Sequence, residues 1–322
     1  MAIGGPRWLT DWREGYGCWN VCASAGGRRA VFLTKNGQPE LYVADFDESR
    51  GRMDDPKRLT RSGVETAWAW LPDNRAVILT SRRSGSLGDQ TDIVKQDFQT
   101  GNAERLVTLD GYISSARVTP DGRWLLFLHS LNLNGSGLHT RIMRAPIEGG
   151  VAEEIGATSG GGVLHCSLVA TCVLLDPVET VYGVEPVKGK GAVLGTLPSL
   201  AGACLSVDGS ELYYVADEHG YRNRIQVLSL VGKPAREVAV QDGSDLGSIE
   251  ALPDGSGWLV VNHDPQSDRD QLLYVTMDGH SRVLWSPAGR YIDWAISSHD
   301  GKHLVIAGAT LKTGAWLLAP LR

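Results

Sequence analysis

The chain has 322 residues and a formal net charge of −6, and 42% of its residues are hydrophobic against 21% that are charged. This composition supplies enough apolar side chains for a large core and argues against intrinsic disorder. The mild acidity, with no basic run of five or more residues, argues against a nucleic-acid partner or an anionic membrane surface.

The N-terminal segment Met1–Trp8 has no basic stretch followed by an apolar core, so it does not resemble a signal peptide. The most apolar windows are residues 163–176 and 304–321. Both are interrupted by polar residues, so neither contains an apolar run long enough to span a bilayer. The sequence therefore predicts a soluble chain that does not insert into a membrane.

A short phrase recurs along the chain, in which a turn rich in Asp, Gly or Asn precedes an apolar run. The turn aspartates lie at 73, 121, 208, 254 and 300, at intervals of 48, 87, 46 and 46 residues. The interval of 87 equals two periods, with a degenerate copy at 168–175, and Gly26 marks a first copy 47 residues before Asp73. The sequence therefore contains seven copies.

Each copy predicts a β-hairpin followed by further strands. Pro fixes φ at the first turn position, Asp bonds its own backbone, and Gly allows the positive φ that closes the turn. The apolar run that follows is typical of a strand buried on both faces. A third strand such as Asp92–Phe98 and a weaker, polar fourth strand such as Ala103–Val107 come after most runs.

Four short antiparallel strands in a period of about 46 residues are typical of a β-propeller blade. Residues 1–322 are therefore predicted to form a single all-β domain, a seven-bladed β-propeller of four-stranded antiparallel blades, with six or eight blades as alternatives. The seventh copy lacks an outer strand, and Pro6–Thr10 resembles the outer-strand phrase Lys57–Thr60. The N-terminal strand is therefore predicted to close the ring.

The five cysteines leave at least one thiol unpaired and show no spacing typical of a zinc site. Cys166 and Cys172 flank a predicted hairpin tip, and directly opposed residues of two strands lie near disulfide distance. A Cys166–Cys172 disulfide is therefore a candidate, and two buried free thiols are the alternative.

Motifs of common enzymes and cofactor sites are absent from the sequence. It has no Gly-x-Ser-x-Gly elbow, phosphate-binding P-loop, His-Glu-x-x-His motif or EF-hand loop. The loop His263–Asp270 places three carboxylates near a histidine, but it is interpreted as a solvated polar loop. We expect no cofactor, no metal site and no enzymatic activity.

Candidate ligand residues follow from propeller geometry, because the innermost strands line a central channel and the loops that enter them frame one face. Aromatic side chains with a few carboxylates at one concave mouth suit a peptide or a small polar ligand. The candidates on this face are Tyr16, Trp19, Glu65, Trp68, Arg83, Tyr112, Tyr291, Asp293 and Trp294. Packing of Trp19, Trp68 and Trp294 between blades is the alternative.

The recurring turn phrases resemble those of TolB-type, WD-repeat-like β-propellers, and the resemblance covers the whole chain. Several stretches are similar to a narrower bacterial group, in which a propeller follows a serine/threonine kinase or winged-helix DNA-binding domain, often across a transmembrane segment. These stretches are Trp70–Leu79, Asp92–Asp97, Ser115–Trp124, His165–Val173, Glu185–Gly191 and Trp294–Gly301. The resemblance implies a sensor module of bacterial signal transduction. Such a module is periplasmic if it is a fragment of a membrane-anchored regulator, and otherwise cytoplasmic.

Three functional hypotheses follow. The favoured one is a non-catalytic module that binds a protein, a peptide or a small ligand through the channel mouth. The alternative is a carbohydrate-active lyase or hydrolase with its site in the central channel. This enzyme hypothesis expects at least two of four side chains within hydrogen-bond or metal-ligand reach, namely His129, Asp245, His263 and Asp293. The third is an inert scaffold whose partner contacts an outer rim.

Overall fold

The structure, a computed structural model, describes residues 17–26, 29–59, 64–85, 88–131, 139–217 and 222–318. Its internal contacts divide the chain into a terminal unit, residues 1–38 and 310–322, and a main unit, residues 39–309. The prediction that residues 1–322 form a single propeller domain stays a prediction. The described residues contain no helix long and apolar enough to cross a membrane.

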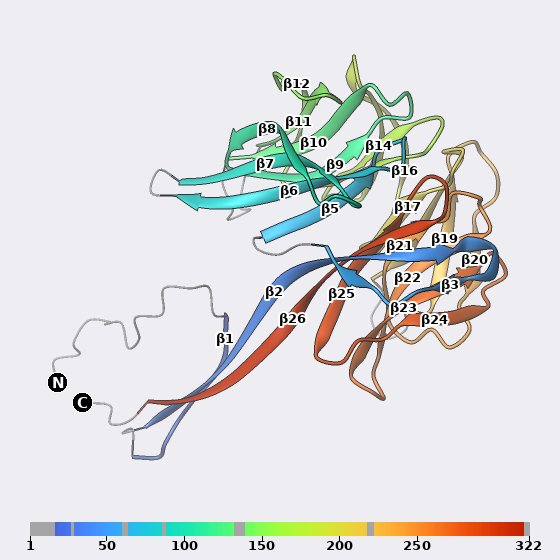
Figure 1. Ribbon diagram of the computed structural model, residues 1–322. Helices are drawn as coiled ribbons and strands as arrows, with labels where there is room; N and C mark the ends of the chain where they lie inside the picture. The colour runs from blue at the N-terminus through green and yellow to red at the C-terminus, as the bar shows by residue number, and fades with distance from the viewer. Residues whose placement is uncertain are drawn as a thin grey trace. The chain divides into compact units, whose positions relative to one another are not determined.

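Five sheets of the main unit are antiparallel and four-stranded, as each sequence repeat predicts (Figure 1). The first sheet consists of β5 (Val64–Trp70), β6 (Ala76–Gly85), β7 (Gly88–Asp97) and β8 (Ala103–Asp110). The second consists of β9 (Tyr112–Val118), β10 (Trp124–Ser130), β11 (His139–Pro146) and β12 (Glu153–Ser159). The third is β13 (Val163–Cys166), β14 (Cys172–Leu175), β15 (Thr180–Glu185), β16 (Gly189–Thr196). The fourth consists of β17 (Leu200–Leu205), β18 (Glu211–Ala216), β19 (Arg224–Ser229) and β20 (Arg236–Ala239). The fifth consists of β21 (Leu246–Ala251), β22 (Gly257–Asp264), β23 (Arg269–Thr276) and β24 (Ser281–Trp285).

The sixth sheet joins strands from both ends of the sequence. Its order runs from β25 (Arg290–Ser297) through β26 (His303–Leu318) to β2 (Ala30–Asp47). Two short strands, β3 (Arg52–Met53) and β4 (Lys57–Arg58), pair with β2 on its outer side, after the 3-10 turn η1 (Glu48–Arg50). Within the terminal unit, β1 (Gly17–Ala23) pairs with the first residues of β2.

The predicted number of seven blades is wrong, because the described residues form six sheets. The first sequence copy does form a hairpin, β1–β2, but β2 continues without a turn to Asp47. Its later part therefore becomes the third strand of the sheet that the seventh copy begins with β25 and β26. The first and last copies thus share one sheet. The predicted closing segment Pro6–Thr10 lies outside the described residues.

The turn phrase folds as its residue types predict. In the copy at Asp121, the aspartate Oδ1 accepts a hydrogen bond from the backbone N–H of Arg123 at 3.1 Å. Gly122 has a φ of 67°, a conformation that favours glycine, and its N–H bonds the carbonyl of Thr119 at 2.8 Å. These local bonds fix the turn between the first and second strands of a sheet.

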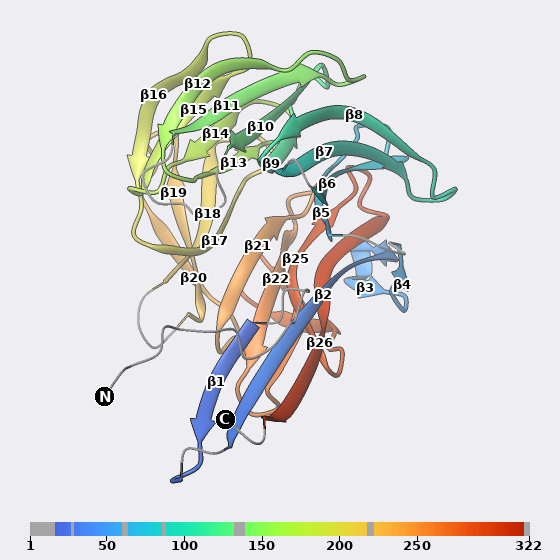
Figure 2. The same cartoon turned by 90° about the vertical axis from the view of Figure 1, so that its left-hand side faces the viewer.

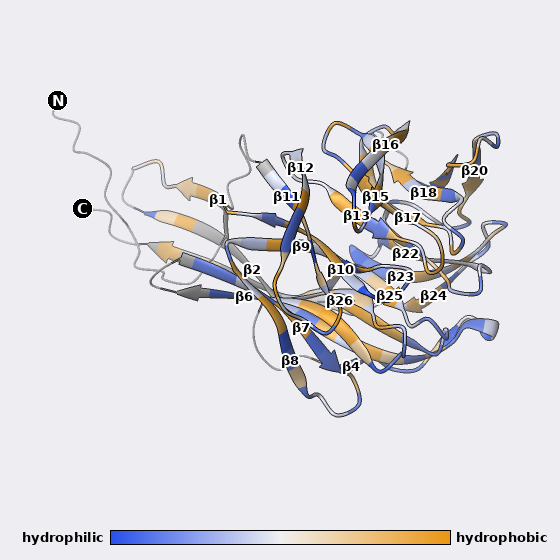
Figure 3. Ribbon diagram, turned by 90° about the horizontal axis from the view of Figure 1, so that it is seen from above, coloured by the Kyte–Doolittle hydropathy of each residue, from blue (hydrophilic) through white to orange (hydrophobic). Residues whose placement is uncertain are grey.

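The core of the main unit lies between the sheets. Six hydrophobic clusters are present among the described residues, and each is shared by two neighbouring sheets, so that every sheet packs on two others. Figure 2 shows β9 and β13, the first strands of two such neighbours, side by side. Orange, hydrophobic stretches follow the strands in Figure 3, whereas many connecting loops are blue. The four-stranded antiparallel sheets therefore form a propeller arrangement, as expected.

Candidate functional site

The main unit contains a cavity of about 560 Å³ where its innermost strands converge. Each of β5, β9, β13, β17, β21 and β25 contributes lining residues. The loop at Asp176–Glu179, which follows β14, lies at the same end as the start of β13 and β17 and completes the wall. The cavity is thus lined by the start of β13 and β17 and by the second halves of β5, β9, β21 and β25.

Irregularities in the innermost strands set which side chains face this cavity. Trp68 is an extra residue in β5, because Ala67 pairs with Leu79 while Ala69 pairs with Ile78. Strand β9 also has one extra residue relative to β10, next to Ser115, whose φ is 55°. Such β-bulges change which face a strand's side chains point to.

The effect of the bulge in β9 is visible in its packing. Ile113 and Ala116 are three residues apart, yet both are buried in the core cluster between the first two sheets. Without the extra residue, strand alternation would place them on opposite faces. Arg117 then lies on the other face of β9 and lines the cavity.

Two tryptophans form one wall of the cavity. The rings of Trp68 and Trp294 stack with their centroids 5.4 Å apart and an interplanar angle of 25°. The Trp68 indole N–H donates to Thr80 Oγ1 at 2.8 Å, and the Trp294 indole N–H donates to the Ala67 carbonyl at 2.9 Å. Both indole N–H groups are therefore hydrogen-bonded within the protein, and the two side chains offer a ligand only their ring surfaces.

Arg117 lies beside this wall. Its Nη1 donates to the Trp68 carbonyl at 2.5 Å and to the Ala116 carbonyl at 3.4 Å, and its guanidinium carbon is 5.6 Å from the Trp68 ring centroid. Burial lowers the pKa of Arg117 from its ordinary value. No other hydrogen bond or ion pair of this guanidinium occurs among the described residues, so Nε and Nη2 are open to the cavity.

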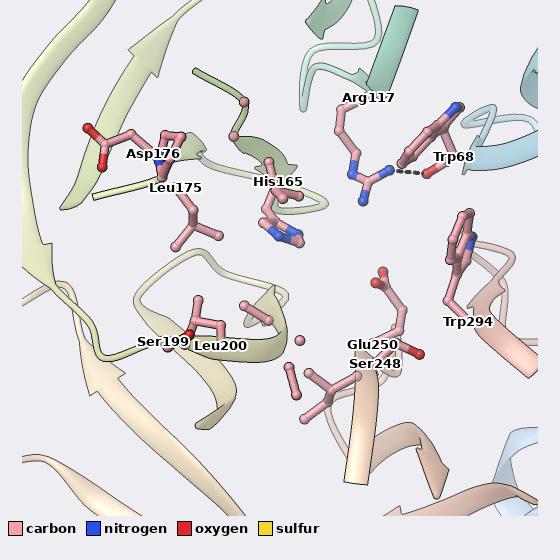
Figure 4. A pocket seen from close by; sticks show the side chains of 18 of the residues that line it. Trp68, Arg117, His165, Leu175, Asp176, Ser199, Leu200, Ser248, Glu250 and Trp294 are labelled. Carbon is pink, nitrogen blue, oxygen red and sulfur yellow. Dashed lines mark hydrogen bonds between the residues drawn. The ribbon is translucent and has the colours of Figure 1, made fainter. Parts of the chain in front are cut away.

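Glu250 and His165 face Arg117 across the cavity (Figure 4). Burial raises the pKa of Glu250 to about 7, although the positive charge of Arg117 opposes this rise. Burial, with a further contribution from Arg117, lowers the pKa of His165 to about 3, so its imidazole is neutral at neutral pH. Within the described part of the chain, neither side chain has a hydrogen bond or an ion pair. The free edge of Arg117 and the side chains of Glu250 and His165 thus line the cavity without protein partners among the residues that the structure describes.

The structure brings two of the predicted residues, Trp68 and Trp294, into this cavity. They also pack against the hydrophobic clusters between sheets, so the alternative interpretation describes them as well. Tyr112 is 38% exposed at the start of β9 and does not line the cavity.

Other predicted residues of this face also lie outside the cavity lining. Burial raises the pKa of Glu65, in β5, and of Tyr291, in β25. Burial, and then the nearby charge of Asp270, raises the pKa of Asp293 to about 6. These three groups are thus partly shielded from water without contacting the cavity.

Arg83 is engaged elsewhere, because its Nη2 lies 3.0 Å from Asp92 Oδ1 in the β6–β7 hairpin. Trp19 belongs to β1 in the terminal unit, and Tyr16 lies outside the described residues. Arg83 does not line the cavity, and the ligand role of Trp19 and Tyr16 stays a prediction.

Two of the four residues expected for an enzyme are neighbours, because the His263 N–H donates to the Asp245 carbonyl at 2.9 Å, but their side chains have other partners. His129 bonds the Asp110 carbonyl at 2.7 Å, and His263 bonds Asp270 at 2.9 Å. Asp245 pairs with Arg222 at 2.6 Å. In the described residues, no side-chain hydrogen bond or ion pair joins any two of the four, and no group of three or more His, Cys, Asp or Glu residues could hold a metal ion.

The cysteine pair forms a disulfide in the structure. Cys166 and Cys172 are directly opposed in the β13–β14 hairpin and their Sγ atoms are bonded. Cys166 also lines a second, smaller cavity of about 120 Å³, which shares Trp68, Arg117, His165 and Glu250 with the first. The pairing matches the candidate disulfide of the sequence and not two free thiols.

Sequence reasoning missed Arg117, Glu250 and His165. A usable signal exists for the first two, because each stands four residues before a turn aspartate, Asp121 or Asp254, in an otherwise apolar strand. A charge at a position that the repeat fills with apolar residues indicates a group facing the channel rather than the core.

No family model and no curated protein matches this chain. Solved structures do match it. A protein provisionally named TolB from Agrobacterium tumefaciens superposes with a TM-score of 0.61 at 13% identity, covering 85% of this chain and 99% of that one. TolB from Acinetobacter baumannii gives a TM-score of 0.55 at 15% identity, covering 88% of this chain and 67% of that one.

A structure of a nidogen/laminin complex is similar as well. Its TM-score is 0.54 at 12% identity, with 84% of this chain and 98% of that chain covered. Identities this low compare folds only. These similarities, together with the six sheets and their convergent innermost strands, show that this chain has the fold of a TolB-type β-propeller.

Proposed function

We propose that this chain is a non-catalytic binding module that takes its ligand, a protein segment, a peptide or a small molecule, into the cavity between its innermost strands. One observation carries the proposal. A cavity of about 560 Å³ combines a stacked tryptophan wall with the free edge of the Arg117 guanidinium and with His165 and Glu250, which have no hydrogen-bond or ion-pair partner among the described residues. Concave apolar sites with a few convergent polar groups are typical of ligand pockets.

The similar folds are consistent with a binding role, since one of them was solved in a nidogen/laminin complex. In this proposal, ligand binding is the input of a bacterial sensor module, as the resemblance in the sequence implies.

An enzyme acting on carbohydrate is the second candidate, and Glu250 favours it. A carboxyl with a pKa raised to about 7 suits a general acid or base. Against it, no side chain of the described residues forms a hydrogen bond with Glu250 that would orient its carboxyl for proton transfer. Turnover of an oligosaccharide that stops in Glu250→Gln would support this alternative.

The binding proposal predicts that removing the tryptophan wall abolishes ligand capture. The test is equilibrium dialysis of the full chain against a bacterial extract of metabolites and peptides, with mass spectrometry of what the protein retains. Trp68→Ala and Trp294→Ala should each lose retained ligands at least tenfold, since a buried aromatic contact contributes about 1–3 kcal/mol.

Trp124→Ala is the matched control, because Trp124 packs under Arg144 in the second sheet, 4.6 Å from ring centroid to guanidinium carbon, and does not line the cavity. Its ligand retention should equal that of the unmodified chain. Equal retention by all three variants would show that the cavity is not the binding site.

A further inference from the structure

Two oppositely charged side chains line the cavity without forming an ion pair. Arg117 comes from β9 and Glu250 from β21, and Figure 4 shows the carboxylate directed toward the guanidinium across open space. No ion pair or hydrogen bond joins them. A buried charge without a partner is costly, and ligand groups of opposite charge would compensate both of these side chains.

We propose that the ligand of this cavity is a small zwitterion, a free amino acid with an apolar side chain, whose carboxylate binds Arg117 and whose ammonium binds Glu250. This inference rests on the proposed binding function and names the ligand class for the same site. It follows from the charges and open atoms of the lining residues.

The guanidinium is oriented for a carboxylate. Nη1 is held by the carbonyls of Trp68 and Ala116, which leaves Nε and Nη2, one edge of the planar fork. That edge matches the two oxygens of a carboxylate in a bidentate pair. The two backbone carbonyls fix the plane of the fork, so little side-chain freedom is lost when the ligand binds.

The carboxylate of Glu250 has the complementary role. Its nearest charged neighbour is Arg117 on β9, while His165 on β13 is neutral at neutral pH because burial lowers its pKa to about 3. A ligand ammonium beside Glu250 would favour the ionised carboxylate, and the tryptophan wall would add a cation–π contact. A ligand with an anion alone would leave Glu250 without a partner, and a cation alone would leave Arg117.

The rest of the cavity is suited to an apolar side chain. Val163, Leu175 and Leu200 line it, and Figure 4 shows Leu175 and Leu200 projecting toward the open space on the side away from the tryptophans. Val163 is 41% exposed, so this apolar wall is accessible. A volume of about 560 Å³ lies within the range of small-molecule sites.

The test is isothermal titration of the full chain with leucine and two analogues that each lack one charged group. 4-Methylpentanoate lacks the ammonium, and 3-methylbutylamine lacks the carboxylate. A panel of the other apolar amino acids is titrated alongside. At least one amino acid should bind, and both of its single-charge analogues should bind at least tenfold more weakly. An analogue that binds as well as the amino acid, or no binding by any amino acid at millimolar concentration, overturns the proposal.

Variants assign each charge to its residue. Arg117→Gln should weaken amino acid binding at least tenfold and leave the affinity for 3-methylbutylamine unchanged. Glu250→Gln should show the converse pattern, with the affinity for 4-methylpentanoate unchanged. Arg83→Gln, whose guanidinium pairs with Asp92 outside the cavity, should bind as the unmodified chain does. If a variant does not fold by circular dichroism, the analogue series on the unmodified chain decides.

The two proposals fail separately. If extract ligands are retained and lost in Trp68→Ala while no amino acid binds, the zwitterion inference is wrong and the binding function stands. If neither an extract ligand nor an amino acid binds, both are wrong.

Discussion

Glu250 links the stability of the protein to pH at the scale of a single residue. Burial raises its pKa to about 7 in the folded chain, above the ordinary value of 4.5 that applies when the chain is unfolded. A raised pKa means that the folded state binds the proton more tightly. The stabilisation is therefore complete below pH 4.5 and is lost as the pH rises through about 7.

Glu250→Gln should therefore stabilise the ligand-free protein at pH 8, because the neutral amide replaces a buried charge. We expect a gain on the order of 1–3 kcal/mol at pH 8, and no gain at pH 4.5. The measurement is thermal unfolding of both proteins across this range. Taking the difference cancels the opposite contribution of His165, whose pKa is lowered. A constant difference at every pH would contradict the assignment.

At the same scale, sequence reasoning identified Trp68 and Trp294 but not their partner Arg117. Large aromatics in a propeller have few places to lie, since they either pack between blades or line the channel, and these two do both. Arg117 reaches the cavity because of a bulge in β9. Nothing in the local sequence marks that extra residue, and the one available signal is the charge of Arg117 at a position that other copies fill with apolar residues.

At the scale of elements, the approach of β17 to β21 depends on Gly202. A Cβ atom at this position would lie 2.6 Å from the Gly247 carbonyl oxygen and 2.8 Å from Ser248 Cα. Real side chains do not approach backbone atoms so closely, and backbone cannot yield as a flexible side chain can. The two innermost strands would have to separate.

Gly202→Ala should therefore destabilise the protein by about 1–3 kcal/mol. Gly247→Ala, on the facing strand, is the matched control, because its nearest neighbour is the Val261 carbonyl oxygen at an ordinary 3.8 Å. Denaturant unfolding of both variants measures the difference. Equal stability of the two would show that β17 and β21 are not in this close contact.

The repeated hairpins were predictable because their causes are local. Asp208 shows this, since its Oδ1 accepts hydrogen bonds from Ser206 and from the Ser210 N–H, which lowers its pKa to about 2. All partners of that turn lie within four residues. The predicted outer strand Ala103–Val107 likewise lies within the observed β8, Ala103–Asp110.

At the scale of the whole molecule, the arrangement of six sheets rather than seven predicts which truncated fragments of the chain can fold. All six interblade clusters lie within residues 39–309, including the two that involve β2 and β26. A fragment of residues 39–309 should therefore unfold cooperatively, with a melting temperature close to that of the full chain. A fragment of residues 48–302 lacks β2 and β26 and should not, because β25 loses its sheet.

Circular dichroism melting of the two fragments measures this. A seven-bladed arrangement requires residues 1–38 to supply part of a blade, so it predicts that both fragments lose cooperative unfolding. Loss of cooperativity in the 39–309 fragment would therefore argue against the six-sheet arrangement.

The sequence by itself determined the blade unit: its period, its turn residues, its second, buried strand and the opposed Cys166–Cys172 pair, since each depends on neighbours a few residues away. Only the tertiary structure decided how many blades form, because β2 and β26 run on past their expected ends and are shared between the first and last copies. The tertiary structure alone also decided which residues form the site. Arg117, His165 and Glu250 are up to 133 residues apart in sequence, and their meeting depends on which strands converge.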